Sequence, residues 1–233
     1  MFFNRITSSP HSNNIKAANK PSISNNYERD DQSTIPSVSS TSNTITIGAG
    51  CYWGTEKYIK KDFQAMFPNS IKSCKVGFMS PKNTEKRFRK PTYRQICSGK
   101  TDFVEVLQVE LNNDDNDDTD SVQLFQNLIK FFFQFHDPTT MDRQGNDIGT
   151  QYASVIFVHD DEQERMVKKI INKLQSALDN REVQNPYYYK RIVTKVWRAT
   201  QFYPAHEDHQ EYLIKNPNGY CNHYYRFKHW PLD

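Results

Sequence analysis

The amino-acid sequence predicts a single mixed α/β (α+β) domain, with a ferredoxin-like core of mixed sheet, helices packed on it and a long C-terminal extension. Apolar residues alternate with period two in several short segments, as in half-buried strands, and recur every three to four residues in others, as in amphipathic helices. The first six segments follow the order strand, helix, strand, strand, helix, strand, which is that of a split βαβ sheet. A length of 233 residues fits one domain plus accessory segments.

The first half of the domain is predicted as three strands and a helix. A strand at 44–47 leads into a helix with an apolar stripe formed by Ile59, Phe63, Met66 and Phe67. Alternating residues predict a strand over 71–78, which places Cys74 in the core, and another over 103–111. The basic stretch between them, 82–94, is interpreted as a solvated loop.

The second half contains further helices and strands. An acidic insertion at 112–118 predicts an exposed loop extended by its own charge repulsion. The later elements are a helix from a Ser121 cap to Phe135, a strand at 152–158, a helix at 161–178, a strand at 192–197 and a short helix at 205–216.

The segment before the domain is predicted to be a disordered tail. Residues 1–43 are rich in serine and asparagine and lack apolar periodicity, so they cannot bury enough surface to fold. No acidic residue precedes Glu28, which makes a mitochondrial transit peptide the alternative, although Arg5 is the only arginine before Arg29. We place the folded domain at 44–224 and a C-terminal tail at 225–233.

Composition excludes several classes of function. A formal charge of +3 is too small and too scattered for nucleic-acid binding, and no apolar run approaches a membrane span. The four cysteines form no CxxC pair and no zinc-ligand spacing, so neither a metal nor a disulfide scaffold is expected. We therefore expect a cytoplasmic protein, monomeric and without membrane or nucleic-acid partners.

The most informative residue is Cys51, at the junction of the first strand and the first helix. Glycines 48, 50 and 54 surround it and allow a sharp turn. A thiol on the first helical turn meets unpaired backbone N–H groups and the positive end of the helix dipole, which favour the thiolate. Tyr52 and Trp53 follow and would cover one side of the sulfur. This pattern indicates a nucleophilic or redox cysteine beside a small hydrophobic pocket.

A second informative residue is Glu105, in the strand at 103–111. It is the only polar residue on a face that period two makes apolar, so lost hydration should raise its pKa and keep it protonated near neutral pH. Beside a cysteine thiolate, it would form a pair of acid and nucleophile. Pairing with a buried arginine, or a place at an exposed sheet edge, is an equal alternative.

Three further residues are candidates with structural alternatives. Asp147 lies in a turn-rich segment, and Tyr152, which begins a strand, could point its hydroxyl into a site. Cys221 lies in a turn-prone segment from which a second thiol could condense with a sulfenic acid on Cys51, although it could also be an incidental free thiol. Cys97 is interpreted as structural, with redox participation as the alternative.

Two other functions fit parts of the pattern. A Cys–His hydrolase would use His136 or His209 as base, but the histidines show no triad-like arrangement. A dinucleotide-binding loop would need glycine three residues after Gly50, where Trp53 would block a pyrophosphate.

Taken together, the motifs resemble those of A-type peptide methionine sulfoxide reductases. The resemblance covers nearly all of 44–224, in family order. It rests on Gly50-Cys51-Tyr52-Trp53-Gly54, Pro91-Thr92-Tyr93-Arg94 with Ser98-Gly99, Glu105, His136-Asp137-Pro138, Gly145-Asn146-Asp147 with Gly149-Thr150-Gln151-Tyr152, His209-Gln210 with Tyr212-Leu213, and Asn216-Pro217 with Gly219-Tyr220-Cys221.

The resemblance implies a reaction and a role for each residue. Cys51 would attack the sulfur of the S-epimer of methionine sulfoxide, free or in proteins, and Glu105 would protonate its oxygen, assisted by the hydroxyls of Tyr93 and Tyr152. The substrate methyl group would lie between Tyr52 and Trp53, and Asp147 and Tyr220 would also line the site. Cys221 would convert the sulfenic acid to a disulfide, and thioredoxin would reduce it without a metal or organic cofactor.

Departures from the family pattern leave questions open. Tyr52 replaces the usual phenylalanine, and its hydroxyl would either polarise the methyl pocket or point to solvent. His206 stands where the family commonly has glutamate, and there is no further C-terminal cysteine after Cys221. A single resolving thiol is therefore the simpler scheme, with Cys97 as the alternative. A non-catalytic protein that captures oxidised methionine is the remaining competing function.

Overall fold

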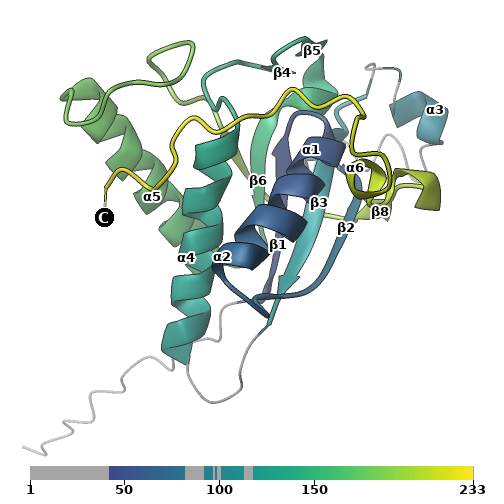
Figure 1. The fold of residues 1–233 in the computed structure, drawn as a ribbon, viewed down its shortest axis with the longest axis horizontal. Coiled ribbons are helices and arrows are strands. Elements are labelled where there is room, and N and C mark those ends of the chain that lie inside the picture. Colours follow the sequence, from purple (N-terminus) through teal and green to yellow (C-terminus); the bar gives the residue numbers. More distant parts are fainter. Residues whose placement is uncertain (1–41, 82–91, 97, 99–100, 113–117, 233) are drawn as a thin grey trace, which may run out of the picture. The chain divides into compact units, whose positions relative to one another are not determined.

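The computed structural model describes residues 42–81, 92–96, 98, 101–112 and 118–232. Within them, the main sheet has six strands in the order β7-β6-β1-β3-β2-β8 (Figure 1). The strands are β1 (Thr44–Ala49), β2 (Ile71–Met79), β3 (Val104–Leu111), β6 (Ser154–Val158), β7 (Lys195–Arg198) and β8 (Tyr203–Pro204). A separate two-stranded ribbon consists of β4 (Arg143–Gln144) and β5 (Asp147–Ile148).

The central four strands confirm the predicted ferredoxin-like core. Their order β6-β1-β3-β2 is antiparallel throughout, as the split βαβ arrangement requires. The added strand β7 pairs parallel to β6, which makes the sheet mixed. The chain is therefore a mixed α/β fold, and β1 and β3 lie inside the sheet, with a paired strand on each side.

The helices pack mainly on one face of this sheet (Figure 1). They are α1 (Tyr52–Lys57), continued by a π-helical turn (Tyr58–Phe63) and α2 (Gln64–Met66), then α3 (Tyr93–Ile96), α4 (Asp118–Phe135), α5 (Asp161–Asp179) and α6 (Tyr212–Lys215). Alternate residues of β3 divide between two clusters: Leu107 and Val109 join the helix-covered core, and Val104 and Val106 pack on the other face, near Trp197. The expected face of β3 is thus the one that meets the helices.

The first and second helices differ from the predictions at their ends. Met66 is 48% exposed and leaves the apolar stripe, because the π-helical turn shifts the angular position of later residues. Helix α4 begins at Asp118, so Ser121 lies inside the helix rather than at its cap.

Two later predictions also need correction. Tyr152 belongs to a 3₁₀ turn (Thr150–Tyr152) and precedes β6 instead of starting it. The helix expected over 205–216 divides into a 3₁₀ turn (Glu207–His209) and α6, because Glu211 between them adopts a left-handed φ of 58°.

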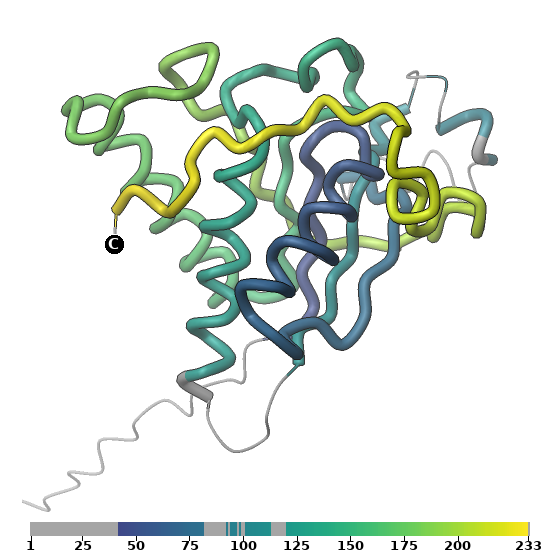
Figure 2. Tube along the Cα trace, in the orientation of Figure 1, coloured from purple at the N-terminus to yellow at the C-terminus, as the bar shows by residue number. Residues whose placement is uncertain are grey.

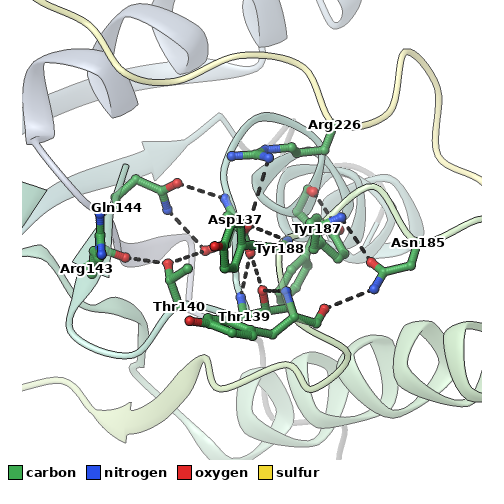
Figure 3. A network of polar contacts seen from close by, with 11 residues as sticks. Asp137, Thr139, Thr140, Arg143, Gln144, Asn185, Tyr187, Tyr188 and Arg226 are labelled. Atoms are coloured by element: carbon green, nitrogen blue, oxygen red, sulfur yellow. Dashed lines mark hydrogen bonds and ion pairs between the residues drawn. The ribbon is translucent and has the colours of Figure 1, made fainter. Parts of the chain in front are cut away.

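Asp137, two residues after α4, organises the loop that approaches the site (Figure 3). Its Oδ1 accepts hydrogen bonds from the backbone and hydroxyl of Thr139, and its Oδ2 accepts one from the backbone N–H of Tyr188 at 2.8 Å. The backbone of Asp137 exchanges two hydrogen bonds with the Gln144 amide, and the Arg226 guanidinium lies 3.8 Å from Oδ2. This buried network joins the loop before β5 to the C-terminal segment.

The neighbouring His136 has a structural place. Its ring is fully buried and is bonded to the Phe132 carbonyl at 2.6 Å and to the Ser154 hydroxyl at 2.9 Å. These contacts hold His136 just after the end of α4, and it does not line the cavity of Cys51.

Residues 225–232 form no helix or strand but pack on the domain: Trp230 is buried, and Lys173 donates to the Leu232 carbonyl.

No helix in the described part of the chain is both long and apolar enough to cross a bilayer. The expectations for 1–41, for most of the basic loop (82–91), for Cys97 and for most of the acidic insertion (113–117) fall outside the described residues.

Candidate active site

Cys51 lies at the tip of the turn that joins β1 to α1. Gly50 adopts a φ of +91°, and a Cβ there would collide with Gln144, so glycine is required on both counts. Cys51 then takes the N-cap position of α1, where the backbone N–H groups of Trp53 and Gly54 lower the pKa of its thiol without forming a regular side-chain cap. The predicted strand-to-helix geometry is therefore present.

The sulfur faces a cavity of about 220 Å³. Seven of the predicted site residues line it together, with two others that the prediction did not include. The lining consists of Cys51, Tyr52, Trp53, Glu105, Asp147, Gln151, Tyr152, His209 and Tyr220. These residues come from the start of α1, from β3, from β5 and the 3₁₀ turn after it, and from residues 209–220, so the site depends on elements far apart in the chain.

The expectation that the helix terminus makes Cys51 a thiolate needs correction. Burial, and next the charge of Glu105, raise its pKa well above the usual value, while the Trp53 and Gly54 N–H groups lower it only partly. Cys51 lies at the helix N-terminus as predicted, but the cost of burying a charged sulfur outweighs the stabilisation that the helix terminus gives to the thiolate. The raised pKa therefore favours the thiol of Cys51 over the thiolate at neutral pH.

Glu105 occupies the position that the strand pattern predicted. It is 8% exposed, lies on an interior strand and accepts a hydrogen bond from the Tyr52 backbone N–H at 3.1 Å. Burial raises its pKa to about 7, with a smaller contribution from Asp147. Glu105 is therefore not at an exposed edge, no arginine among the described residues pairs with it, and the raised pKa favours a large protonated fraction near neutral pH.

Aromatic side chains form one wall of the cavity. Trp53 stacks on Tyr212, with ring centroids 3.9 Å apart, and on His209 at 5.7 Å. Tyr52 is almost fully buried and packs against Phe78 and His209. Of the two orientations considered for the Tyr52 hydroxyl, the one in solvent is excluded by this burial.

The opposite rim is polar. The Tyr220 hydroxyl donates to Asp147 Oδ1 at 3.2 Å, and the Asn222 amide donates to Asp147 Oδ2 at 2.8 Å and to the Gln144 carbonyl at 2.6 Å. Burial raises the pKa of Asp147, and these two donors oppose the shift. Asp147 thus connects the ribbon of β4 and β5 to the C-terminal segment at the mouth of the cavity.

Two tyrosine hydroxyls were predicted as donors, and of these the structure describes the side chain of Tyr152 but not that of Tyr93. Tyr152 lines the cavity, and burial, followed by the charge of Glu105, raises its pKa to about 12, so its hydroxyl stays protonated and can donate. Tyr93 begins α3, but its side chain falls outside the described part of the chain.

Cys221 does not line the cavity. It is half-buried and packs against the core, with its Sγ 3.9 Å from Nδ1 of His223. Cys74, predicted in the core, is half-buried in β2 and packs against the core rather than lying within it, and burial raises its pKa to about 12.

A protein-family model described as "Peptide methionine sulfoxide reductase" matches residues 43–230. The chain belongs to the peptide methionine sulfoxide reductase family. Its curated relatives include the Saccharomyces cerevisiae enzyme of that name, 38% identical over 185 residues, which cover 78% of this chain and 89% of the yeast protein. The Mycoplasma genitalium relative, named peptide methionine sulfoxide reductase MsrA, is 39% identical over 178 residues, covering 76% of this chain and 96% of the relative.

Solved structures of reductases in this family share the fold. Reduced Mxr1 from S. cerevisiae is 37% identical, with a TM-score of 0.64, and the alignment covers 80% of this chain and 93% of the yeast chain. Methionine sulfoxide reductase A of Corynebacterium diphtheriae is 33% identical, with a TM-score of 0.58 and 77% of each chain covered.

Among the residues of this reductase that line the cavity, Gln151 and His209 were not predicted as part of it. Both lie within motifs that carried the family resemblance, so that membership was the available signal. His206, in contrast, is exposed, pairs with Asp208 and lies outside the cavity lining. Its replacement of the usual glutamate therefore has no consequence for the walls of the site.

Gly54 of the reductase offers a test of packing behind the nucleophile. A Cβ at this position would collide with the His223 ring. We expect Gly54→Ala to destabilise the protein by about 1–3 kcal/mol, because overpacking outweighs the gain in helix propensity. Urea unfolding of both proteins measures this difference, and a more stable variant would contradict the packing described here.

Proposed function

We propose that this thiol-dependent methionine sulfoxide reductase acts on the S-epimer of methionine sulfoxide and thereby repairs oxidised proteins. The observation that carries the proposal is the shared cavity of the Cys51 thiol and a Glu105 carboxyl with a pKa near 7. A sulfoxide oxygen leaves only when it is protonated, so the reaction needs an acid beside the nucleophile. An apolar wall beside that pair suits a methyl group.

In the first step, Cys51 Sγ attacks the sulfoxide sulfur while protonated Glu105 gives its proton to the oxygen. The attack forms a bond between Sγ and the substrate sulfur, and the thiol proton passes to the Glu105 carboxylate. As the protonated oxygen moves from the substrate sulfur to Sγ, the substrate S–O bond and the new S–S bond break and an S–O bond to Cys51 forms. The products are methionine and a Cys51 sulfenic acid, and the glutamic acid is restored. This transfer accounts for a resting thiol: Cys51 loses its proton only as it attacks.

The cavity walls supply the remaining requirements. The Tyr152 hydroxyl donates to the oxygen as charge develops on it, and the family resemblance adds Tyr93 as a second donor. The indole of Trp53 and the ring of Tyr52 enclose the methyl group, so that the three substituents on sulfur meet different walls. That difference selects one epimer. Asp147 and Tyr220 hold the rim.

In the second step, the Cys221 thiol attacks the sulfenic acid and forms a disulfide with Cys51. An external dithiol must then reduce this bond, and we propose thioredoxin as that partner, with no metal or organic cofactor. Since the cycle depends on reduced thiols, we propose a cytoplasmic location for a monomeric enzyme, with the mitochondrion as the alternative. Oxidised proteins, peptides and free methionine sulfoxide are the proposed substrates.

Two competing functions fit the site less well. A Cys–His hydrolase would hold an imidazolium beside the sulfur and lower its pKa, whereas the Cys51 pKa is raised by burial and by carboxyl charge. A protein that only captures oxidised methionine would need neither a thiol nor a protonatable carboxyl at the oxygen.

Separate assays of the two epimers test the proposal. We expect the enzyme, supplied with thioredoxin and its reductase, to form methionine from a peptide with S-methionine sulfoxide and none from the R-epimer peptide. Chromatography of the products measures both. Turnover of the R-epimer alone, or binding without any methionine, would refute the assignment.

A Cys221→Ser variant tests the recycling scheme. Without external reductant, we expect one equivalent of methionine per enzyme and a Cys51 sulfenic acid that persists, because no thiol resolves it. Mass spectrometry after a sulfenic-acid trap detects the adduct. A disulfide between Cys51 and Cys97 in this variant would instead assign the resolving role to Cys97.

A further inference from the structure

His223 lies in the C-terminal segment, drawn in yellow in Figure 2, and its ring contacts both Cys221 and the turn that carries Cys51. Its Nε2 is 2.6 Å from the Ala49 carbonyl, two residues before Cys51. Its ring also packs so closely on Gly54 that no Cβ fits there. The imidazole therefore contacts the chain on both sides of the nucleophile.

These contacts fix the tautomer of the ring. A carbonyl oxygen only accepts hydrogen bonds, so Nε2 must carry the proton and Nδ1 must hold the lone pair. Nδ1 faces Cys221 Sγ at 3.9 Å, within range of a weak S–H···N hydrogen bond. Burial lowers the pKa of His223 to about 4, so the ring stays neutral at physiological pH.

The backbone of His223 is held as well. The Tyr58 hydroxyl, from the π-helical turn that follows α1, donates to the His223 carbonyl at 3.2 Å. The side chain and the backbone of one residue thus attach the segment that carries Cys221 to the helix that begins at Cys51.

We propose that His223 is a positioning residue for disulfide formation: it anchors the C-terminal segment to the Cys51 turn and orients the Cys221 thiol toward the sulfenic acid. The inference rests on the proposed role of Cys221. In that step, the S–S bond forms and the Cys51 S–O bond breaks. The Cys221 proton leaves with the hydroxyl as water, so no outside electron donor is consumed. A neutral ring that accepts a hydrogen bond, rather than a proton, suffices for this.

Two substitutions separate the anchor from simple packing. His223→Gln keeps an N–H that can reach the Ala49 carbonyl, whereas His223→Phe fills similar space without any hydrogen bond. His159→Phe is the matched control, because this histidine bonds Thr46 and follows the end of β6 that lies away from Ala49. Thermal melting verifies that each variant is folded.

The measurement is a single turnover without reductant, quenched over time with a sulfenic-acid trap and a thiol alkylator and read by mass spectrometry. For His223→Phe we expect the first equivalent of methionine at the wild-type rate and disulfide formation slowed about 10- to 100-fold, the cost of a misplaced reacting group. His223→Gln should recover most of the rate, and His159→Phe should match the wild type.

Wild-type disulfide formation in His223→Phe would overturn the inference, as would an equal loss in both steps, which indicates general damage. Equal slowing in His223→Gln and His223→Phe would also overturn the anchoring role. The Cys221→Ser control, run alongside, identifies a failure of the proposed cycle itself, since a disulfide would then form at the wild-type rate without Cys221.

Discussion

A Cys51→Ser variant is expected to lose methionine sulfoxide reduction almost entirely, by about 10,000-fold or more, the scale of loss when a nucleophile is removed. Serine is a favoured N-cap residue and is close to cysteine in size, so the fold should be retained at this cap position. A serine hydroxyl, however, cannot accept the sulfoxide oxygen, whereas the Cys51 thiol accepts it and becomes a sulfenic acid. Methionine released from the S-epimer peptide is the measurement.

The matched control for this prediction is Cys74→Ser. Cys74 is also a half-buried thiol, but it lies in β2 and does not line the cavity. We expect this variant to keep near wild-type activity. If Cys51→Ser repaired peptides as well as Cys74→Ser does, the nucleophile would have to be assigned elsewhere.

The second large effect is expected for Glu105→Gln, which should lower kcat about 100- to 10,000-fold, the usual contribution of a general acid. The amide is isosteric, and its oxygen can still accept from the Tyr52 N–H, so packing is preserved. Only the transferable proton is lost. Steady-state kinetics with saturating thioredoxin measure the change.

The role of Glu105 as the acid also predicts the direction in which activity changes with pH. The acid form of Glu105 is the reactive one, so wild-type activity should fall as the pH rises through about 7. Glu105→Gln should lack this inflection. Glu56→Gln is a demanding control, because Glu56 is 1% exposed and burial also raises its pKa to about 7, but it does not line the cavity. An unchanged inflection in Glu105→Gln, or its loss in Glu56→Gln, would contradict the assignment of Glu105 as the acid.

The sequence predicted the fold where local pattern determines structure. Period two placed Glu105 among core residues of β3, and the glycines around Cys51 indicated the turn that Gly50 makes with its positive φ. The order of helices and strands along the chain was sufficient to predict the antiparallel core of the sheet. Element ends were less predictable, since the π-helical turn after α1 and the left-handed Glu211 leave no periodic signal.

The site was predictable as a set of residues but not in its energetics. Local reasoning at Cys51 considered the helix terminus, whereas the degree of burial depends on Trp53, Tyr52 and the C-terminal segment closing around the sulfur. Desolvation is a property of the assembled fold and therefore reversed the expected protonation state. The contacts of His223 were unpredictable for the same reason, because they join residues far apart in the chain.

The protonated thiol of Cys51 bears on how the enzyme survives in the conditions that create its substrates. Peroxides and alkylating agents react with the thiolate form of cysteine, and a sulfur overoxidised to the sulfinic or sulfonic acid would be dead for catalysis. Because burial raises the pKa of Cys51, little of its sulfur is in the reactive thiolate form between turnovers. Burial disfavours ionisation of Cys51 between turnovers and thereby protects the nucleophile of an enzyme that works where oxidants are present.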